Sequence, residues 1–183
     1  HGYWFETHGA EQRFSNLVAF GDNKVHSSGH FAFQTYSPGW QPSKISVIKN
    51  LKVYRNAFWG AFLHDTNNLV FEGGIFSDNG SRDVMINRGD NIVFNGTVFD
   101  GKSAFADPHC PGQEKVAISL NPTRLNEFDY TGTFAGATLI NTKFQHWSDK
   151  DTQCFDTPSR PLSIDPDQVF IPQFAAPHYF ENI

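Results

Sequence analysis

Residues 47–50 read VIKN, residues 70–73 read VFEG and residues 93–96 read VFNG, so one pattern returns at an interval of 23. The apolar residue after each copy keeps the same interval: Val53, Phe76 and Phe99. A strand of a few residues cannot bury an apolar face alone, but equivalent positions of successive units can stack into interior columns. The interval therefore predicts a repeat architecture.

The repeat extends downstream of these three copies. Residues 138–141 read TLIN, begin 45 positions after residue 93 and are followed by Phe144. That distance is one short of two intervals. Residues 116–120 read as a strand between the copies, which leaves residues 102–115 as an inserted loop.

The other half of the unit repeats as well, because residues 60–64 align with residues 83–87. Upstream, residues 14–17 together with Phe20 resemble the first strand of the unit, and residues 29–33 resemble its second strand. We therefore expect coils of the same kind throughout residues 1–156.

The repeat predicts an all-β fold, a right-handed parallel β-helix with coils of about 23 residues. One interior column is expected to hold Ile48, Phe71, Phe94 and Leu139, and the other Val53, Phe76, Phe99 and Phe144. The corners need left-handed backbone, which Asn and Gly tolerate, and they are assigned to Asn16, Asn50, Gly73, Gly96 and Asn141. A β-sandwich and a β-propeller are the alternatives, and neither places residues at this interval.

The tail, residues 157–183, differs in composition from the coils. It contains five prolines: Pro158, Pro161, Pro166, Pro172 and Pro177. Proline lacks the N–H that a strand ladder needs. We expect this tail to be irregular, and to pack along the outside or cap the end of the stack.

Charge and composition exclude several functions. The net charge is −5 and no run of Lys or Arg occurs, so a nucleic-acid partner is not expected. No apolar run approaches the roughly 20 residues of a membrane span. We expect no cofactor and, for lack of a recognisable ligand spacing, no metal.

Other features fit an extracellular or cell-surface protein. Asn79 and Asn95 begin N-glycosylation sequons. Cys110 and Cys154 either form one disulfide, which we favour, or are two unrelated buried thiols.

Three further segments carry a family resemblance: HGYWFE at residues 1–6, FGDNKVHSSG at residues 20–29 and YSPG at residues 36–39. They resemble the β-helix region of the cell-migration-inducing hyaluronidase, the transmembrane hyaluronidase and fibrocystin-like surface proteins. The resemblance covers roughly residues 1–150. It implies a right-handed parallel β-helix in a large extracellular protein, and some members degrade or bind hyaluronan. Members usually carry a glycine-rich β-domain that this sequence lacks, so no catalytic residue is transferred.

Asp65 and Arg88 are the strongest candidates for a site, because an interval of 23 stacks them on one outer face, with Asp83 and Asp90 nearby. They could form an acid/base site with Arg88 binding a sugar carboxylate. The alternative, which we favour, is a surface ion pair.

His26 and His30 flank a Ser-Ser-Gly turn. They could be general acid/base residues or metal ligands, but a turn held by histidine hydrogen bonds is the favoured interpretation. Four tryptophans could stack on sugar rings or pack under loops: Trp4, Trp40, Trp59 and Trp147.

Two functions follow from these observations. The first is a structural or interaction module of a larger surface or filamentous assembly, which contacts other protein chains or further domains and has a polysaccharide as a second kind of ligand. The alternative is a depolymerase of a hyaluronan-like polysaccharide, acting through Asp65 and Arg88. The acidic net charge disfavours tight binding of a polyanion.

Overall fold

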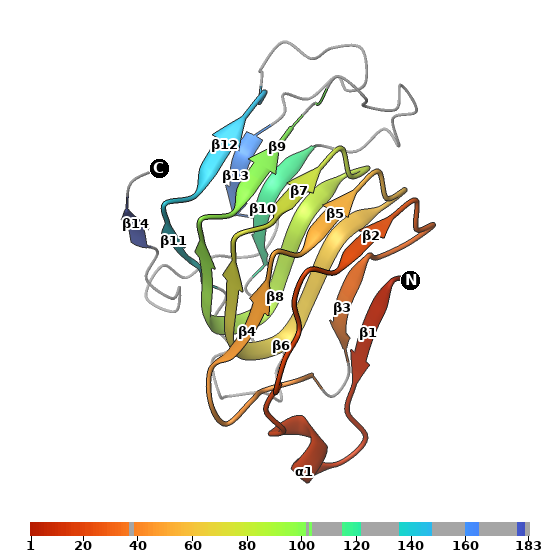
Figure 1. Cartoon of the computed structure of the whole chain (residues 1–183), viewed down its shortest axis with the longest axis vertical. Coiled ribbons are helices and arrows are strands. Elements are labelled where there is room, and N and C mark those ends of the chain that lie inside the picture. The colour runs from red at the N-terminus through yellow and green to blue at the C-terminus, as the bar shows by residue number, and fades with distance from the viewer. Residues whose placement is uncertain are drawn as a thin grey trace, which may run out of the picture.

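The computed structural model describes residues 1–36, 39–101, 103, 115–121, 136–147, 160–164 and 179–181 (Figure 1). Strands dominate this part of the chain, which confirms the all-β prediction, and α1, Ala10–Arg13, is its one helix. The strands are β1 Tyr3–Glu6, β2 Lys24–His26, β3 Phe33–Tyr36, β4 Ser46–Lys49, β5 Lys52–Tyr54, β6 Trp59–Glu72, β7 Ile75–Ser77, β8 Arg82–Asn95, β9 Val98–Asp100, β10 Val116–Asn121, β11 Thr138–Ile140, β12 Lys143–Gln145, β13 Arg160–Ile164 and β14 Tyr179–Glu181. None of the described residues forms a helix long and apolar enough to cross a membrane.

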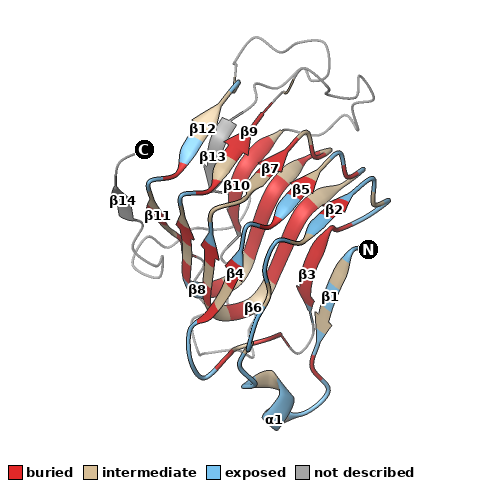
Figure 2. Ribbon diagram, in the orientation of Figure 1, coloured by how far each residue is buried: buried red, intermediate tan, exposed pale blue. Residues whose placement is uncertain are grey.

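The strands form two parallel sheets. The larger has nine strands in the order β1-β3-β6-β8-β10-β13, with β4 beside β6, β11 beside β8 and β14 beside β11. The smaller has the order β12-β9-β7-β5-β2. Figure 1 shows the strands side by side across the molecule, and Figure 2 shows the buried positions running along their central members.

Residues 23 positions apart are neighbours, as the sequence predicts. Phe71 pairs with Phe94 and Phe76 with Phe99 across parallel strands. The two rings of each pair stack, with centroids 5.0 Å apart in the first and 5.4 Å apart in the second. The predicted place of residues 138–141 in the first column is also confirmed, because Leu139 pairs with Phe94, 45 positions earlier. These columns fill the interior between the sheets.

Left-handed backbone marks the corners. Asn50 and Asn141 have φ of 48°, and Gly73 and Gly96 have φ of 67° and 68°. The assignment of Asn16 to this corner is wrong. Asp22 takes its place with φ of 56°, and its carboxylate accepts a hydrogen bond from the side-chain amide of Asn50 at 3.0 Å.

Gly96 allows a test of the corner. A Cβ at this position would meet only the backbone nitrogen of Gly73 at 4.0 Å, so backbone conformation rather than space limits the residue. We expect Gly96→Val to lower the free energy of unfolding by about 1–2 kcal/mol, because a β-branched residue is strained there. Gly96→Asn should cost less, since Asn50 and Asn141 hold equivalent corners. Equal losses for the two variants in urea denaturation would contradict this explanation.

The upstream alignment fails because one corner is longer. Phe33 pairs with Ala61, an interval of 28, whereas Ile48 pairs with Phe71 at 23. The five additional residues lie between β3 and β4. The predicted strand at residues 14–17 is absent, and the second predicted strand, at residues 29–33, begins only at Phe33.

The prediction of an irregular tail is wrong for its described residues, 160–164 and 179–181, which form strands. β13 pairs with β10, and β14 pairs with β11, both in parallel. β13 contains Pro161 and is, among the described strands, the last on its side of the sheet. A proline is tolerated there because the missing N–H need not face a neighbouring strand.

Candidate functional site

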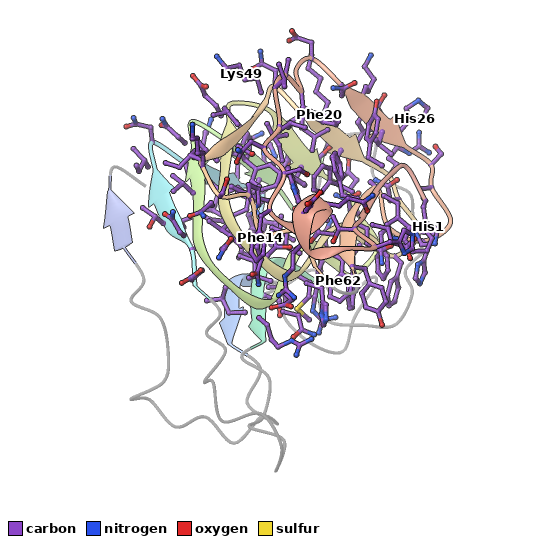
Figure 3. All side chains as sticks on the ribbon, turned by 90° about the horizontal axis from the view of Figure 1, so that it is seen from below. His1, Phe14, Phe20, His26, Lys49 and Phe62 are labelled. Atoms are coloured by element: carbon purple, nitrogen blue, oxygen red, sulfur yellow. The ribbon has the colours of Figure 1, made fainter. Side chains whose placement is uncertain are left out.

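A second apolar cluster lies outside the main core. Phe62 belongs to it, whereas its neighbours Ala61 and Leu63 belong to the main core, as strand alternation requires. We call this surface the aromatic face, and it consists of Phe31, Tyr36, Phe58, Trp59, Phe62 and Met85, together with Trp4, which lies in register with Gln34 and Phe62. Phe62 is its centre, with the rings of Phe31 and Trp59 both 5.2 Å away, and is labelled in Figure 3.

The aromatic face leaves two flat rings open to solvent. Trp4 is 49% exposed and Tyr36 is 42% exposed, whereas Phe62 is only 9% exposed. The strands explain this difference, because Trp4 is on the terminal strand β1 and Tyr36 is at the end of β3. The ring of Tyr36 packs against that of Phe62, with centroids 6.0 Å apart.

Polar atoms without a partner lie among these rings. Within the described part of the chain, buried atoms that make no hydrogen bond include Gln34 Oε1, Trp59 Nε1, His64 Nδ1, Asn87 Oδ1 and Arg88 Nε. Gln34 lies beside Phe62, and His64 lies beside Asn87, in the parallel pairing. These atoms are both buried and unpaired, which costs free energy because each has lost its contact with water without gaining a partner.

His64 is neutral in this arrangement. Arg88 Nη2 lies 2.7 Å from His64 Nε2, which accepts the hydrogen bond. Burial lowers the pKa of His64 from its ordinary value, the charge of Arg88 lowers it further, and Asp65 partly opposes both. The ring proton is therefore on Nδ1, which makes this nitrogen a donor.

Asp65 does not pair with Arg88, so that part of the sequence prediction is wrong. The two residues do occupy equivalent left-handed corners, with φ of 49° and 57°. The carboxylate of Asp65 instead accepts from Arg13 Nη2 at 2.7 Å and from the amide of Gln41 at 3.1 Å. Arg13 is the last residue of α1, and its side chain reaches this corner. Asp90 is exposed and pairs with Asn67 along the strands.

Asp83 lies inside the molecule rather than on the outer face. It is 1% exposed, and its Oδ1 accepts a hydrogen bond from the amide of Asn79 at 2.7 Å. Asn79 Oδ1 in turn accepts from Asn56 at 2.7 Å, which forms a polar ladder within the stack. Burial raises the pKa of Asp83 to about 7, more than Lys115 and Asn79 lower it.

The ladder bears on the sequon at Asn79. This residue is 2% exposed and its amide nitrogen, the atom that would carry a glycan, donates to Asp83. A glycan at Asn79 is therefore incompatible with this arrangement. Asn95 is half-buried, and its glycosylation stays a prediction.

The two histidines of the Ser-Ser-Gly turn are exposed. His26 Nδ1 lies 3.2 Å from the Ser27 hydroxyl, and its ring stacks on Tyr54 with centroids 5.0 Å apart. His30 stacks on Phe58 at 5.3 Å. His26 thus contacts its neighbour in the turn, and the role of the two histidines stays a prediction. No group of three potential metal ligands occurs among the residues that the structure describes.

The other two tryptophans pack rather than face solvent. Trp40 is 3% exposed, stacks on Phe5 and donates from Nε1 to the Ser15 carbonyl at 2.8 Å. Trp147 donates to the Phe99 carbonyl at 3.1 Å. Cys110 and Cys154 fall outside the described residues, so their disulfide stays a prediction.

The sequence thus singled out Trp4, Trp59 and Arg88 as candidate site residues. It did not predict that these residues lie around one surface. The signal was available in the alternation of strand residues around Phe62. Comparison with known proteins gives no further guide: no protein-family model, curated protein or solved structure matches this chain.

Proposed function

We propose that this chain is a segment of right-handed parallel β-helix from an extracellular or cell-surface protein, in which it serves as a structural and interaction module. The support comes from the parallel pairing at intervals of 23 and from left-handed corners at equivalent positions. The resemblance to hyaluronidase-like and fibrocystin-like surface proteins points to the same setting.

We further propose that the aromatic face binds a glycan. The observation that carries this proposal is the pair of exposed rings, Trp4 and Tyr36, on the aromatic face. A sugar ring has an apolar face that stacks on an aromatic ring.

The alternative of a depolymerase has less support. Such enzymes use two carboxyl groups that flank the scissile bond. The carboxylate of Asp65 already accepts hydrogen bonds from Arg13 and Gln41. Asp83 is buried inside the stack, where a polymer cannot reach it. The geometry therefore favours binding without cleavage.

Substitution of the two exposed rings tests the glycan proposal. We expect the variant Trp4→Ala, Tyr36→Ala to bind glycans on an array of surface and matrix polysaccharides roughly tenfold more weakly than the unchanged chain, because stacking is lost. Phe14→Ala is the matched control, since Phe14 is 48% exposed but is not part of the aromatic face. Equal binding by all three proteins, or no glycan binding by the unchanged chain, would refute the proposal.

A further inference from the structure

An exposed carboxylate lies beside the two exposed rings of the aromatic face. Tyr3 and Phe5 of β1 pack against the main core. Trp4 and Glu6 alternate with them and therefore point outward, where both are exposed. Glu6 is also in register with Tyr36 on β3. Neighbouring strands lie about 4.8 Å apart and alternate residues of a strand about 6.6 Å apart, so a ligand that stacks on either ring comes within reach of this carboxylate.

The charge of Glu6 is open to a ligand. Its ionic contact in the described part of the chain is with His8, whose Nε2 lies 3.7 Å from Glu6 Oε1, and the two side chains are 75% and 41% exposed. An ion pair as open to water as this one is weak. Asp65 differs, because its carboxylate is already held by Arg13 at 2.7 Å. Glu6 can therefore accept hydrogen bonds from outside the protein.

The arginines of this surface, Arg82 and Arg88, lie on β8, which β3 and β6 separate from β1. Both are half-buried. Arg88 Nη2 lies 2.7 Å from His64 Nε2. The guanidinium of Arg82 lies over the ring of Trp59, 5.3 Å from its centroid. Both cations thus already face side chains of the protein, whereas Glu6 faces solvent, so the exposed charge beside the exposed rings is negative.

We infer that the aromatic face binds a neutral polysaccharide rather than a uronic-acid polymer, and that Glu6 determines this specificity. A carboxylate accepts hydrogen bonds from sugar hydroxyls, and such charge-assisted bonds are stronger than those between neutral groups. The same carboxylate repels a sugar that carries a negative charge, and like-charge contacts of this kind exclude wrong partners. This choice of ligand class rests on the glycan binding proposed above.

Matched oligosaccharides test the specificity on the whole chain. Each pair consists of a neutral oligosaccharide and the same molecule with the primary alcohol of every sugar oxidised to a carboxylate, with a glucan, a mannan and a galactan as backbones. We expect the unchanged chain to bind at least one neutral member, and to bind its oxidised form roughly tenfold more weakly at low ionic strength. The variant Trp4→Ala, Tyr36→Ala should lose most of this binding.

Glu6→Gln is the decisive variant, because glutamine keeps the shape of the side chain and removes its charge. We expect the oxidised oligosaccharide to bind this variant roughly fivefold more tightly than it binds the unchanged chain. Glu72→Gln is the matched control, since it removes the same charge from another exposed glutamate, which pairs with Lys49 at 3.5 Å. Figure 3 shows Lys49 and Phe62 toward opposite sides of the molecule, so this control should leave the preference for neutral sugars unchanged.

The possible outcomes distinguish the specificity from the glycan binding itself. Oxidised oligosaccharides that bind through the two rings as tightly as the neutral ones, or more tightly, would overturn the role of Glu6 and leave glycan binding in place. Loss of that binding in Arg88→Ala would then assign the contact to Arg88. Equal effects of Glu6→Gln and Glu72→Gln would attribute the preference to net charge and would also overturn the role of Glu6. No binding of any oligosaccharide would refute both proposals.

Discussion

Asp83→Asn is expected to raise the free energy of unfolding at pH 8 by roughly 4 kcal/mol. Asp83 is buried, and its pKa in the folded chain is about 7, against an ordinary value of 3.8. At pH 8 the folded chain must hold a buried carboxylate, whose desolvation opposes folding. An asparagine has nearly the same shape, and its Oδ1 can accept the hydrogen bond that Asn79 donates.

The sign of the pH dependence follows from the raised pKa. Between pH 3.8 and 7 the folded state binds more protons at Asp83 than the unfolded state does, so this residue favours folding at low pH. That contribution is complete below pH 3.8 and is lost as the pH rises through 7. We expect the two proteins to be similarly stable at pH 4 and to diverge up to pH 8, as urea denaturation measures. If the free energies of unfolding of the two proteins changed with pH in the same way across this range, the buried position of Asp83 would be contradicted.

Phe94→Ala is expected to lower the free energy of unfolding by about 3–5 kcal/mol. Phe94 is fully buried, stacks on Phe71 at 5.0 Å and meets Phe99 edge-on at 5.4 Å. Removing the ring leaves a cavity that the neighbouring layers cannot fill, since their own rings are fixed by stacking. This loss is a large fraction of the stability of a typical domain.

Phe14→Ala provides the matched control for this experiment. Phe14 is half exposed beyond α1, so the same substitution should change the free energy of unfolding by less than about 1 kcal/mol. Denaturant titrations of both variants would make the comparison. A loss at Phe94 no larger than that at Phe14 would mean that the columns do not form the core.

The interior of the fold could be predicted from sequence because the interior repeats. Phe71 and Phe94 must fill equivalent places, so their interval appears directly in the sequence. The corners follow for the same reason, since Asn50 and Gly73 meet the same backbone requirement. Loops have no such requirement, and the longer corner between β3 and β4 was enough to misplace residues 14–17.

The site was less predictable, because its contacts do not follow the interval. Arg13 reaches Asp65 across 52 positions, and nothing in the repeat indicates that pairing. The ladder between Asn56 and Asn79, by contrast, keeps the interval of 23 and could have been recognised. Two asparagines at equivalent positions of a buried stack predict amides that bond to each other.

The stacked rings of Phe76, Phe99 and Phe144 have a consequence for how such a protein evolves. The ring of Phe99 stacks on Phe76 at 5.4 Å and on Phe144 at 5.2 Å, although extra chain lies between the last two layers. Duplication of one unit would therefore lengthen the molecule without redesigning its centre. The number of units and the residues on the outer surface can therefore change independently during evolution, because neither change alters the packing of the interior rings.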